Sequence, residues 1–207
     1  MIGLSLALLT LLASPSPGEV ALRQVAEAYA RFDFVTARYS QERSTPLMRT
    51  PLKSEGRLTY RRQPLTLLLQ TERTTIRLDE ARYEVYRPGK GQLERFAIGA
   101  EKGVEVLHMG FGQRVDHLLE RFAITRTEGE APMVVHLTAK AADARVKTLR
   151  LTVDPVAKRL TALSYAAETG ETVTFRLTDI ELRPTLPPGA LELTYPADTR
   201  VIQHHRE

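Results

Sequence analysis

The chain has 207 residues, with 29 lysines and arginines against 25 aspartates and glutamates, and a formal net charge of +4. This length is enough for one domain with a substantial core. The charges of both signs are interspersed, and no basic stripe of the kind that binds nucleic acid is present, so no nucleic-acid partner is expected. The sequence has no cysteine, which excludes disulfides, thiolate metal sites, a cysteine nucleophile and a lipidated cysteine.

Residues 1–13 are apolar and uncharged, and a segment of small residues, 14–18, follows them. The apolar stretch is shorter than the roughly 20 residues that a membrane-spanning helix needs. An apolar core followed by small residues is typical of a secretory signal peptide. We therefore expect residues 1–18 to be a signal peptide and linker, and residues 19–207 to be a single exported domain. The alternative is an N-terminal core helix.

The first element of the expected domain is a helix over 19–32, because Leu22, Val25, Ala26, Tyr29 and Phe32 recur at helical spacing. A strand over 34–43 follows, since its apolar and polar residues alternate. Two prolines then interrupt strand pairing over 44–51.

Residues 38–88 contain several short segments in which apolar and polar residues alternate. A period of two residues indicates a strand with one dry and one wet face, and the short polar connections favour antiparallel neighbours. We therefore predict a curved meander with a continuous apolar face, and what covers this face is the functional question. The predicted members of this face are Leu58, Tyr60, Leu65, Leu67, Leu69, Ile76, Leu78, Tyr83 and Val85.

Four glycines surround a group of apolar residues over 99–112, and a short helix is predicted after them from the spacing of Val115, Leu118, Leu119 and Phe122. A glycine-punctuated apolar segment within a β-rich chain is a candidate lid. The alternative is a plain crossover connection packed on the core. The residues that we assign to the lid are Val106, Leu107, Met109, Phe111 and Leu118.

The second half of the chain returns to strands, predicted over 122–127, 133–139, 146–153, 160–166 and 172–183. A shift of apolar parity between Leu177 and Ile180 predicts a β-bulge at Thr178 and Asp179. Short closing strands are expected over 191–195 and at 201–202. The predicted fold class is mainly β (α+β), an incomplete and strongly curved antiparallel β-barrel covered by short helices.

Signals for catalysis are poor. The five histidines show no zinc-binding spacing, and neither a nucleophile elbow nor a phosphate-binding glycine loop is present. Asp79 and Glu80 are adjacent, which favours a hairpin turn over a pair of catalytic carboxylates. We therefore expect no enzyme, no catalytic residues, no metal and no cofactor.

Taken together, the chain resembles the LolA family of periplasmic lipoprotein carriers. The segment Phe34-x-x-x-Arg38-Tyr39-Ser40-Gln41 is similar to the family's first strand. The segment from Ser54 to Pro64 is similar to its G-x-L/F-x-x-x-R-P hairpin, and the segment from Asp79 to Tyr86 to its D-G-x-x-L-W-x-Y strand. The ending Leu191-x-Leu193-x-Tyr195-Pro196 resembles F-x-F-x-x-P. The resemblance covers nearly the whole expected domain, and the order and spacing of the motifs support it more than any single motif does.

The resemblance implies a lipid-binding cavity between sheet and helices, which the nine residues of the meander's apolar face would line. The cavity would hold the acyl chains of a lipoprotein, or of another lipid, while the protein carries them from the inner to the outer membrane. It implies a monomer in the periplasm, with an inner-membrane ABC-type transporter and an outer-membrane receptor as partners. Arg62 takes the place of the family's lid-latching arginine, although Gln63 separates it from Pro64. Glu80 stands where the family has glycine, which indicates a divergent carrier.

Two other function classes stay open at this point. One is a regulatory module that senses lipids or lipoproteins on the same fold, which would need a surface for a protein partner. The other is an enzyme built on the scaffold, which the missing catalytic cluster argues against.

Overall fold

The computed structural model describes residues 14–96 and 115–204. Within them are two helices, a short 3-10 turn and twelve strands. The helices are α1 (Pro17–Ala30) and α3 (Val115–Arg121), and the turn is η1 (Pro88–Lys90). The strands are β1 (Phe34–Ser44), β2 (Leu52–Arg61), β3 (Thr66–Gln70), β4 (Thr75–Asp79), β5 (Tyr83–Arg87), β6 (Gln92–Phe96), β7 (Phe122–Glu128), β8 (Met133–Ala139), β9 (Val146–Asp154), β10 (Arg159–Ala167), β11 (Thr172–Arg183) and β12 (Arg200–His204).

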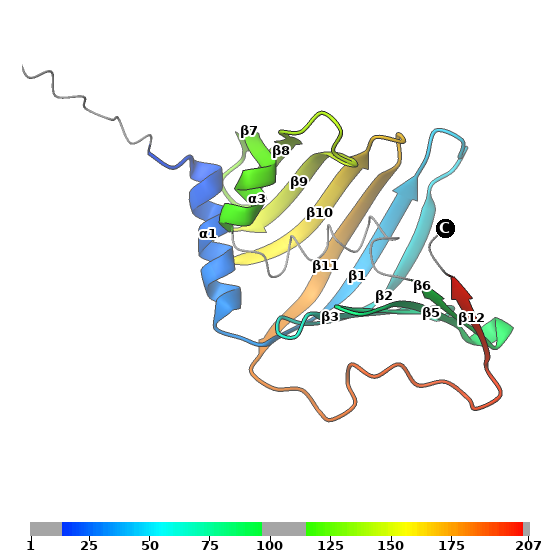
Figure 1. The fold of residues 1–207 in the computed structure, drawn as a ribbon. Helices are drawn as coiled ribbons and strands as arrows, with labels where there is room; N and C mark the ends of the chain where they lie inside the picture. The colour runs from blue at the N-terminus through cyan, green and yellow to red at the C-terminus, as the bar shows by residue number, and fades with distance from the viewer. Residues whose placement is uncertain (1–13, 97–114, 205–207) are drawn as a thin grey trace, which may run out of the picture.

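All twelve strands form one sheet in the order β12-β6-β5-β4-β3-β2-β1-β11-β10-β9-β8-β7. Neighbours are antiparallel apart from β12, which lies parallel to β6. In Figure 1, strands β7 to β11, β1 and β2 rise together as a slanted wall, while β3 to β6 lie below them and are seen nearly edge-on. The sheet is therefore strongly curved and open, which confirms the predicted fold class.

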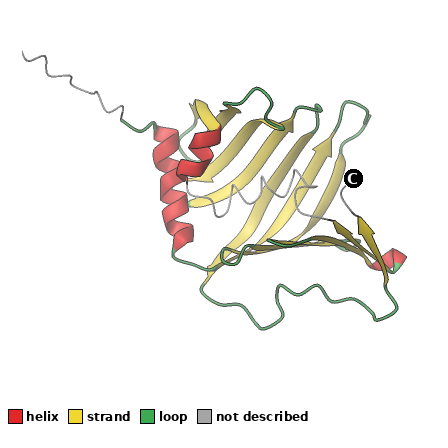
Figure 2. Ribbon diagram, viewed as in Figure 1, coloured by secondary structure: helices red, strands yellow, loops and turns green. Residues whose placement is uncertain are grey.

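Helix α1 begins two residues before the predicted start. The hydroxyl of Ser16 accepts a hydrogen bond from the backbone N–H of Glu19 at 3.2 Å, and Pro17 occupies the first turn, where a missing N–H costs nothing. The helix buries Leu22, Val25 and Tyr29 against the sheet. Figure 2 shows both helices side by side on one side of the sheet.

We call the side of the sheet that carries the helices the inner face. Alternate residues of the strands on this face join α1 and α3 in one apolar cluster that extends from Phe122 on β7 to Val85 on β5. The core is therefore continuous across both the wall and the strands below it.

The opposite, outer face is also covered over β3 to β6. Leu68, Tyr86 and Leu93 have the outer parity and are buried, although they are not part of the inner cluster. The segment 184–199, which links β11 to β12, runs beneath these strands on the side away from the helices (Figure 1). The guanidinium of Arg77 donates a hydrogen bond to the carbonyl of Leu191 at 3.2 Å, and the ring of Tyr195 lies 6.0 Å from that of Tyr86.

Three details of the sequence prediction are decided here. The register of β1 on β11 gains one extra residue after Thr178, and Asp179 has a φ of 51°, so the predicted bulge is confirmed. The expected closing strand over 191–195 is wrong, because this segment crosses the outer face and the free edge of β6 is taken by β12 instead. The Asp79 carboxylate accepts hydrogen bonds from the backbone N–H groups of Ala81 and Arg82, both at 2.8 Å, and so builds the predicted turn.

Candidate functional site

The predicted cavity residues form two parallel rows on the inner face of β2 to β5. The first row consists of Tyr60, Leu67, Leu78 and Tyr83, which are register partners on successive strands; the second consists of Leu58, Leu69, Ile76 and Val85. Leu65 precedes β3 and packs against the same cluster. The structure therefore brings all nine side chains together on one apolar surface.

The two rows consist of large apolar side chains that differ in how deeply they are buried. Leu58, Tyr60, Leu67 and Leu69 are each at most 4% exposed, whereas Ile76 and Leu78 are only partly buried. Tyr83 packs its ring 5.4 Å from that of Phe96, which extends the apolar surface to β6. Such a surface offers apolar area and shape and presents few directional groups.

Three tyrosines contribute phenol groups to the interior. Burial raises the pKa of Tyr39 and Tyr60 to about 12 in each case. Burial also raises the pKa of Tyr29 to about 12, although its hydroxyl accepts a hydrogen bond of 3.1 Å from the backbone N–H of Leu160. These phenols stay neutral at physiological pH, so they add no charge to the apolar interior.

The apolar rows end in a polar group at β5, β6 and β12. Arg87 forms an ion pair with Glu94, and the side-chain amide of Gln92 donates to the same carboxylate at 2.9 Å. The ring of His204 stacks on that of Phe96, with centroids 4.3 Å apart and planes within 2°. The inner face thus has an apolar centre and a polar rim on the side away from the helices.

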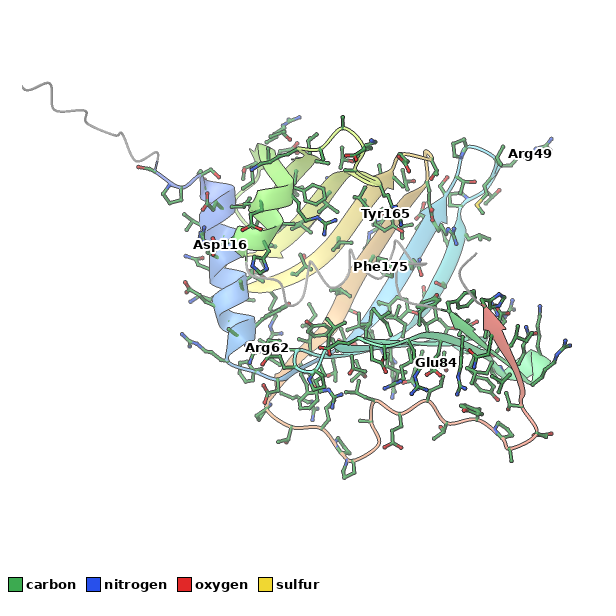
Figure 3. The ribbon with its side chains drawn as sticks, viewed as in Figure 1. Arg49, Arg62, Glu84, Asp116, Tyr165 and Phe175 are labelled. Atoms are coloured by element: carbon green, nitrogen blue, oxygen red, sulfur yellow. The ribbon has the colours of Figure 1, made fainter. Side chains whose placement is uncertain are left out.

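The predicted latch residue Arg62 lies where β2 ends, beside the connection from α1 to β1 (Figure 3). Its backbone N–H donates to the carbonyl of Asp33 at 3.0 Å, and its Nη2 lies 3.4 Å from the Asp33 carboxylate. Its Nε is buried, with no hydrogen-bond partner among the described residues. The side chain therefore has donor capacity left at this corner of the inner face.

A second ionic contact ties the two helices together. Arg23 on α1 contacts Glu19 of its own helix and Asp116 of α3, both at 2.8 Å. Hydrogen bonds to Glu19 and then to Asp116 raise the pKa of Arg23 above its ordinary value. Leu118, the described member of the predicted lid, is a buried residue of α3, with 3% exposure. Val106, Leu107, Met109 and Phe111 lie outside the described residues, as does the apolar N-terminal stretch 1–13.

No group of three or more histidines, aspartates or glutamates in the described segments is placed to hold a metal ion. Neither described helix has the length and apolar composition to cross a membrane. The inner face therefore presents apolar surface area with charged side chains at its border.

The sequence analysis missed the burial of the outer face under the segment 184–199. A signal for it existed, because Leu67, Leu68 and Leu69 form an uninterrupted apolar run, and such a run is typical of a strand that is covered on both faces. Glu84 gave no such signal. It is only 4% exposed and lies between Arg77 and Arg95, with Oε1 2.8 Å from Arg95 Nε.

Comparison with known proteins finds no protein-family model that matches this sequence and no matching curated protein. Among solved structures, the chain is similar to an uncharacterized conserved protein from Thermus thermophilus, with 13% identity and a TM-score of 0.54, over 88% of this chain and 97% of that one. It also matches a LolA superfamily protein from Nitrosomonas europaea, with 12% identity, a TM-score of 0.42 and coverage of 86% and 99%. A putative outer membrane lipoprotein-sorting protein domain from Vibrio parahaemolyticus matches with 11% identity, a TM-score of 0.44 and coverage of 84% and 97%.

The likeness to the Thermus thermophilus protein, at 13% identity, is one of fold. The open curved sheet itself agrees with the architecture that the sequence analysis predicts.

Proposed function

We propose that the chain is a periplasmic carrier that binds the acyl chains of a lipoprotein, or of another lipid, on the inner face of β2 to β5. The observation that supports this most is the pair of apolar rows, in which the register of four strands aligns eight large side chains without a charged group among them. Ile76 and Leu78 in these rows are only partly buried, so part of this apolar surface is open to a ligand.

Hydrocarbon burial alone supplies enough free energy for this task. Each buried CH₂ group contributes about 0.8 kcal/mol, so ten methylene groups contribute roughly 8 kcal/mol before the cost of ordering the chain. A leucine-rich surface makes few directional bonds that would have to break on release. This suits a carrier, which must deliver its cargo as well as collect it.

The proposed route follows the resemblance to the LolA family. The carrier would be exported by its N-terminal signal segment, collect its cargo from an inner-membrane ABC-type transporter and deliver it as a monomer to an outer-membrane receptor. The polar rim of Arg87, Glu94 and Gln92 would then face the polar part of the bound lipid.

The first test places a charge in the middle of the first row. Leu67→Glu should abolish displacement of a fluorescent acyl probe, because a carboxylate next to hydrocarbon chains costs several kcal/mol. Val85→Phe should weaken binding by filling the same space without a charge. Val156→Glu is the matched control, because Val156 is 83% exposed in a turn and far from the rows in the sheet order.

Circular dichroism and the thermal midpoint establish that each variant is folded. Probe affinity that is unchanged in both Leu67→Glu and Val85→Phe, with the fold intact, would contradict the assignment of this face.

A second test addresses the latch. We propose that Arg62 holds the closed state at the corner beside Asp33, so Arg62→Gln should speed the exchange of a bound acyl probe several-fold while leaving the fold intact. Stopped-flow dilution measures that rate, and Arg150→Gln, an exposed arginine on β9, is the control. Equal exchange rates in the wild type and in Arg62→Gln would remove the latch from the proposal.

A further inference from the structure

One strand in the middle of the sheet has a free edge. Strand β2 pairs with β1 along its whole length, from Leu52 to Arg61, but β3 pairs only with Arg57 to Arg61. Among the described residues, the half-strand 52–56 therefore has a strand neighbour on one side alone. Its residues are exposed or half-buried, and an unpaired strand edge of this kind presents its N–H and C=O groups to a further strand.

Gly56 marks the point where β3 turns away. A Cβ at this position would lie 2.0 Å from the backbone oxygen of Gln70, so only glycine allows β3 to end so close to β2. The turn that follows is fixed by a hydrogen bond of 2.8 Å from the N–H of Thr71 to the carbonyl of Thr74. These two contacts fix the notch between the half-strand and this turn.

A hollow of about 620 Å³ adjoins the notch on the outer face. Its charged side chains are Arg38, Arg57, Arg176, Glu55 and Glu72. The arginines come from three neighbouring strands, β1, β2 and β11, and Arg38 lies directly opposite Arg57 in the register. Like charges placed opposite each other on a sheet are destabilising, so the fold alone does not account for this pair.

Few polar or acidic groups of the protein itself pair with these arginine side chains. Within the described part of the chain, the structure records no hydrogen bond or ion pair for the side chains of Arg57 and Arg176, and Arg38 approaches Asp179 only at 3.8 Å. The hollow therefore holds three arginines against two glutamates, and the guanidinium groups of Arg57 and Arg176 have no recorded partner among the described residues.

Apolar side chains stand at the other end of the free edge. Leu47 is 96% exposed and Leu52 is 58% exposed, and both lie at the tip of the β1–β2 hairpin. Arg49 marks this tip in Figure 3, where it projects beyond the neighbouring strands. The free strand edge and the exposed leucines thus lie along β2 and the hairpin connection before it, and the cationic hollow adjoins the same edge.

We infer that this stretch is a docking site for an extended, acidic segment of a partner protein, which adds to the sheet as a strand along residues 52–56. Main-chain hydrogen bonds to the free edge would hold the segment, an acidic side chain would reach Arg57 and Arg38, and an apolar side chain would cover Leu52. The site lies at the free edge and outer face of the sheet, so it is separate from the proposed lipid-binding rows and does not depend on them.

The experiment selects binders from a displayed library of random octapeptides with the wild-type chain, and measures their affinities by fluorescence anisotropy. The expected peptides contain β-branched residues and at least one carboxylate. Arg57→Glu should weaken them by roughly tenfold to a hundredfold, as expected for the loss of charge-assisted hydrogen bonds. Arg150→Glu is the matched control, because it places the same charge reversal on the outer face of β9, away from the hollow.

Amide hydrogen exchange with a bound peptide locates the site. Protection confined to residues 52–56 and the adjoining turn, together with the loss in Arg57→Glu, would support the inference. Selected peptides without acidic preference, equal losses in Arg57→Glu and Arg150→Glu, or protection elsewhere would overturn it. Concentration-dependent dimerisation that Arg57→Glu abolishes would overturn it in favour of a second copy of this chain. Unchanged thermal midpoints of both variants exclude misfolding as the cause of any loss.

Discussion

Three buried tyrosines make the interior of this protein sensitive to alkali. Tyr29, Tyr39 and Tyr60 are at most 5% exposed, and burial raises the pKa of each to about 12. In the unfolded chain a phenol ionises near pH 10. Below pH 10 both states are protonated and the stability is complete. As the pH rises from 10 to 12, the unfolded state ionises first, and stability falls by about 2 to 3 kcal/mol for each tyrosine.

Tyr39→Phe isolates one of these groups, because no hydrogen bond to its hydroxyl is recorded within the described segments. The variant should match the wild type in unfolding free energy at pH 8 and should lose about one third less between pH 10 and pH 12. Urea unfolding across this pH range measures the difference. A Tyr39→Phe curve that follows the wild-type curve over this pH range would refute the assignment.

At the scale of single elements, the sharp divergence of β3 from β2 depends on one glycine. The Cβ of an alanine at position 56 would meet the Gln70 carbonyl at 2.0 Å and the ring of Tyr39 at 3.1 Å. Gly56→Ala should therefore lower the unfolding free energy by about 2 kcal/mol or more, as expected of an overpacked site. The measurement is equilibrium urea unfolding at neutral pH.

Gly89 supplies the control for that prediction, because a Cβ there meets nothing within 4 Å. Gly89→Ala should stay within about 0.5 kcal/mol of the wild type. If Gly56→Ala were as stable as Gly89→Ala, the backbone of β3 would not depend on the close approach that the structure shows.

Helices and strands could be predicted from the sequence where their apolar residues recur at a regular local spacing. Alternation gave β8 and β11 with the correct bounds, and helical spacing gave α1 to within two residues. The path of the segment 184–199 was not predictable, because its contacts with Arg77 and Tyr86 join residues about one hundred positions apart. Local periodicity holds no information on such pairings.

For the candidate site, parity predicted which side chains of β2 to β5 share a face, and the register confirms the shared face. The buried carboxylate of Glu84 could not be foreseen, since its two arginine partners are placed by neighbouring strands. The free edge of β2 was equally hidden, because it depends on where β3 stops pairing.

On the scale of the whole molecule, the sheet separates two environments. Its inner face is apolar from the helices to β5, and its outer face is polar over the wall and sealed by the segment 184–199 over β3 to β6. Because the segment 184–199 covers the outer side, β3 and β5 bury side chains there and also present large apolar side chains on the inner face. This division of the two faces is what the proposed carrier function requires.

The most direct test of that function is mass spectrometry of the protein purified after export, first intact under native conditions and then after extraction with organic solvent. Our account predicts additional mass on the intact protein and an acylated lipid or lipopeptide in the extract, both lost in Leu67→Glu and kept in Val156→Glu. A wild-type protein with no bound lipid, which also fails to bind a fluorescent acyl probe, would contradict it and would mean that the inner face closes on itself as a solid core.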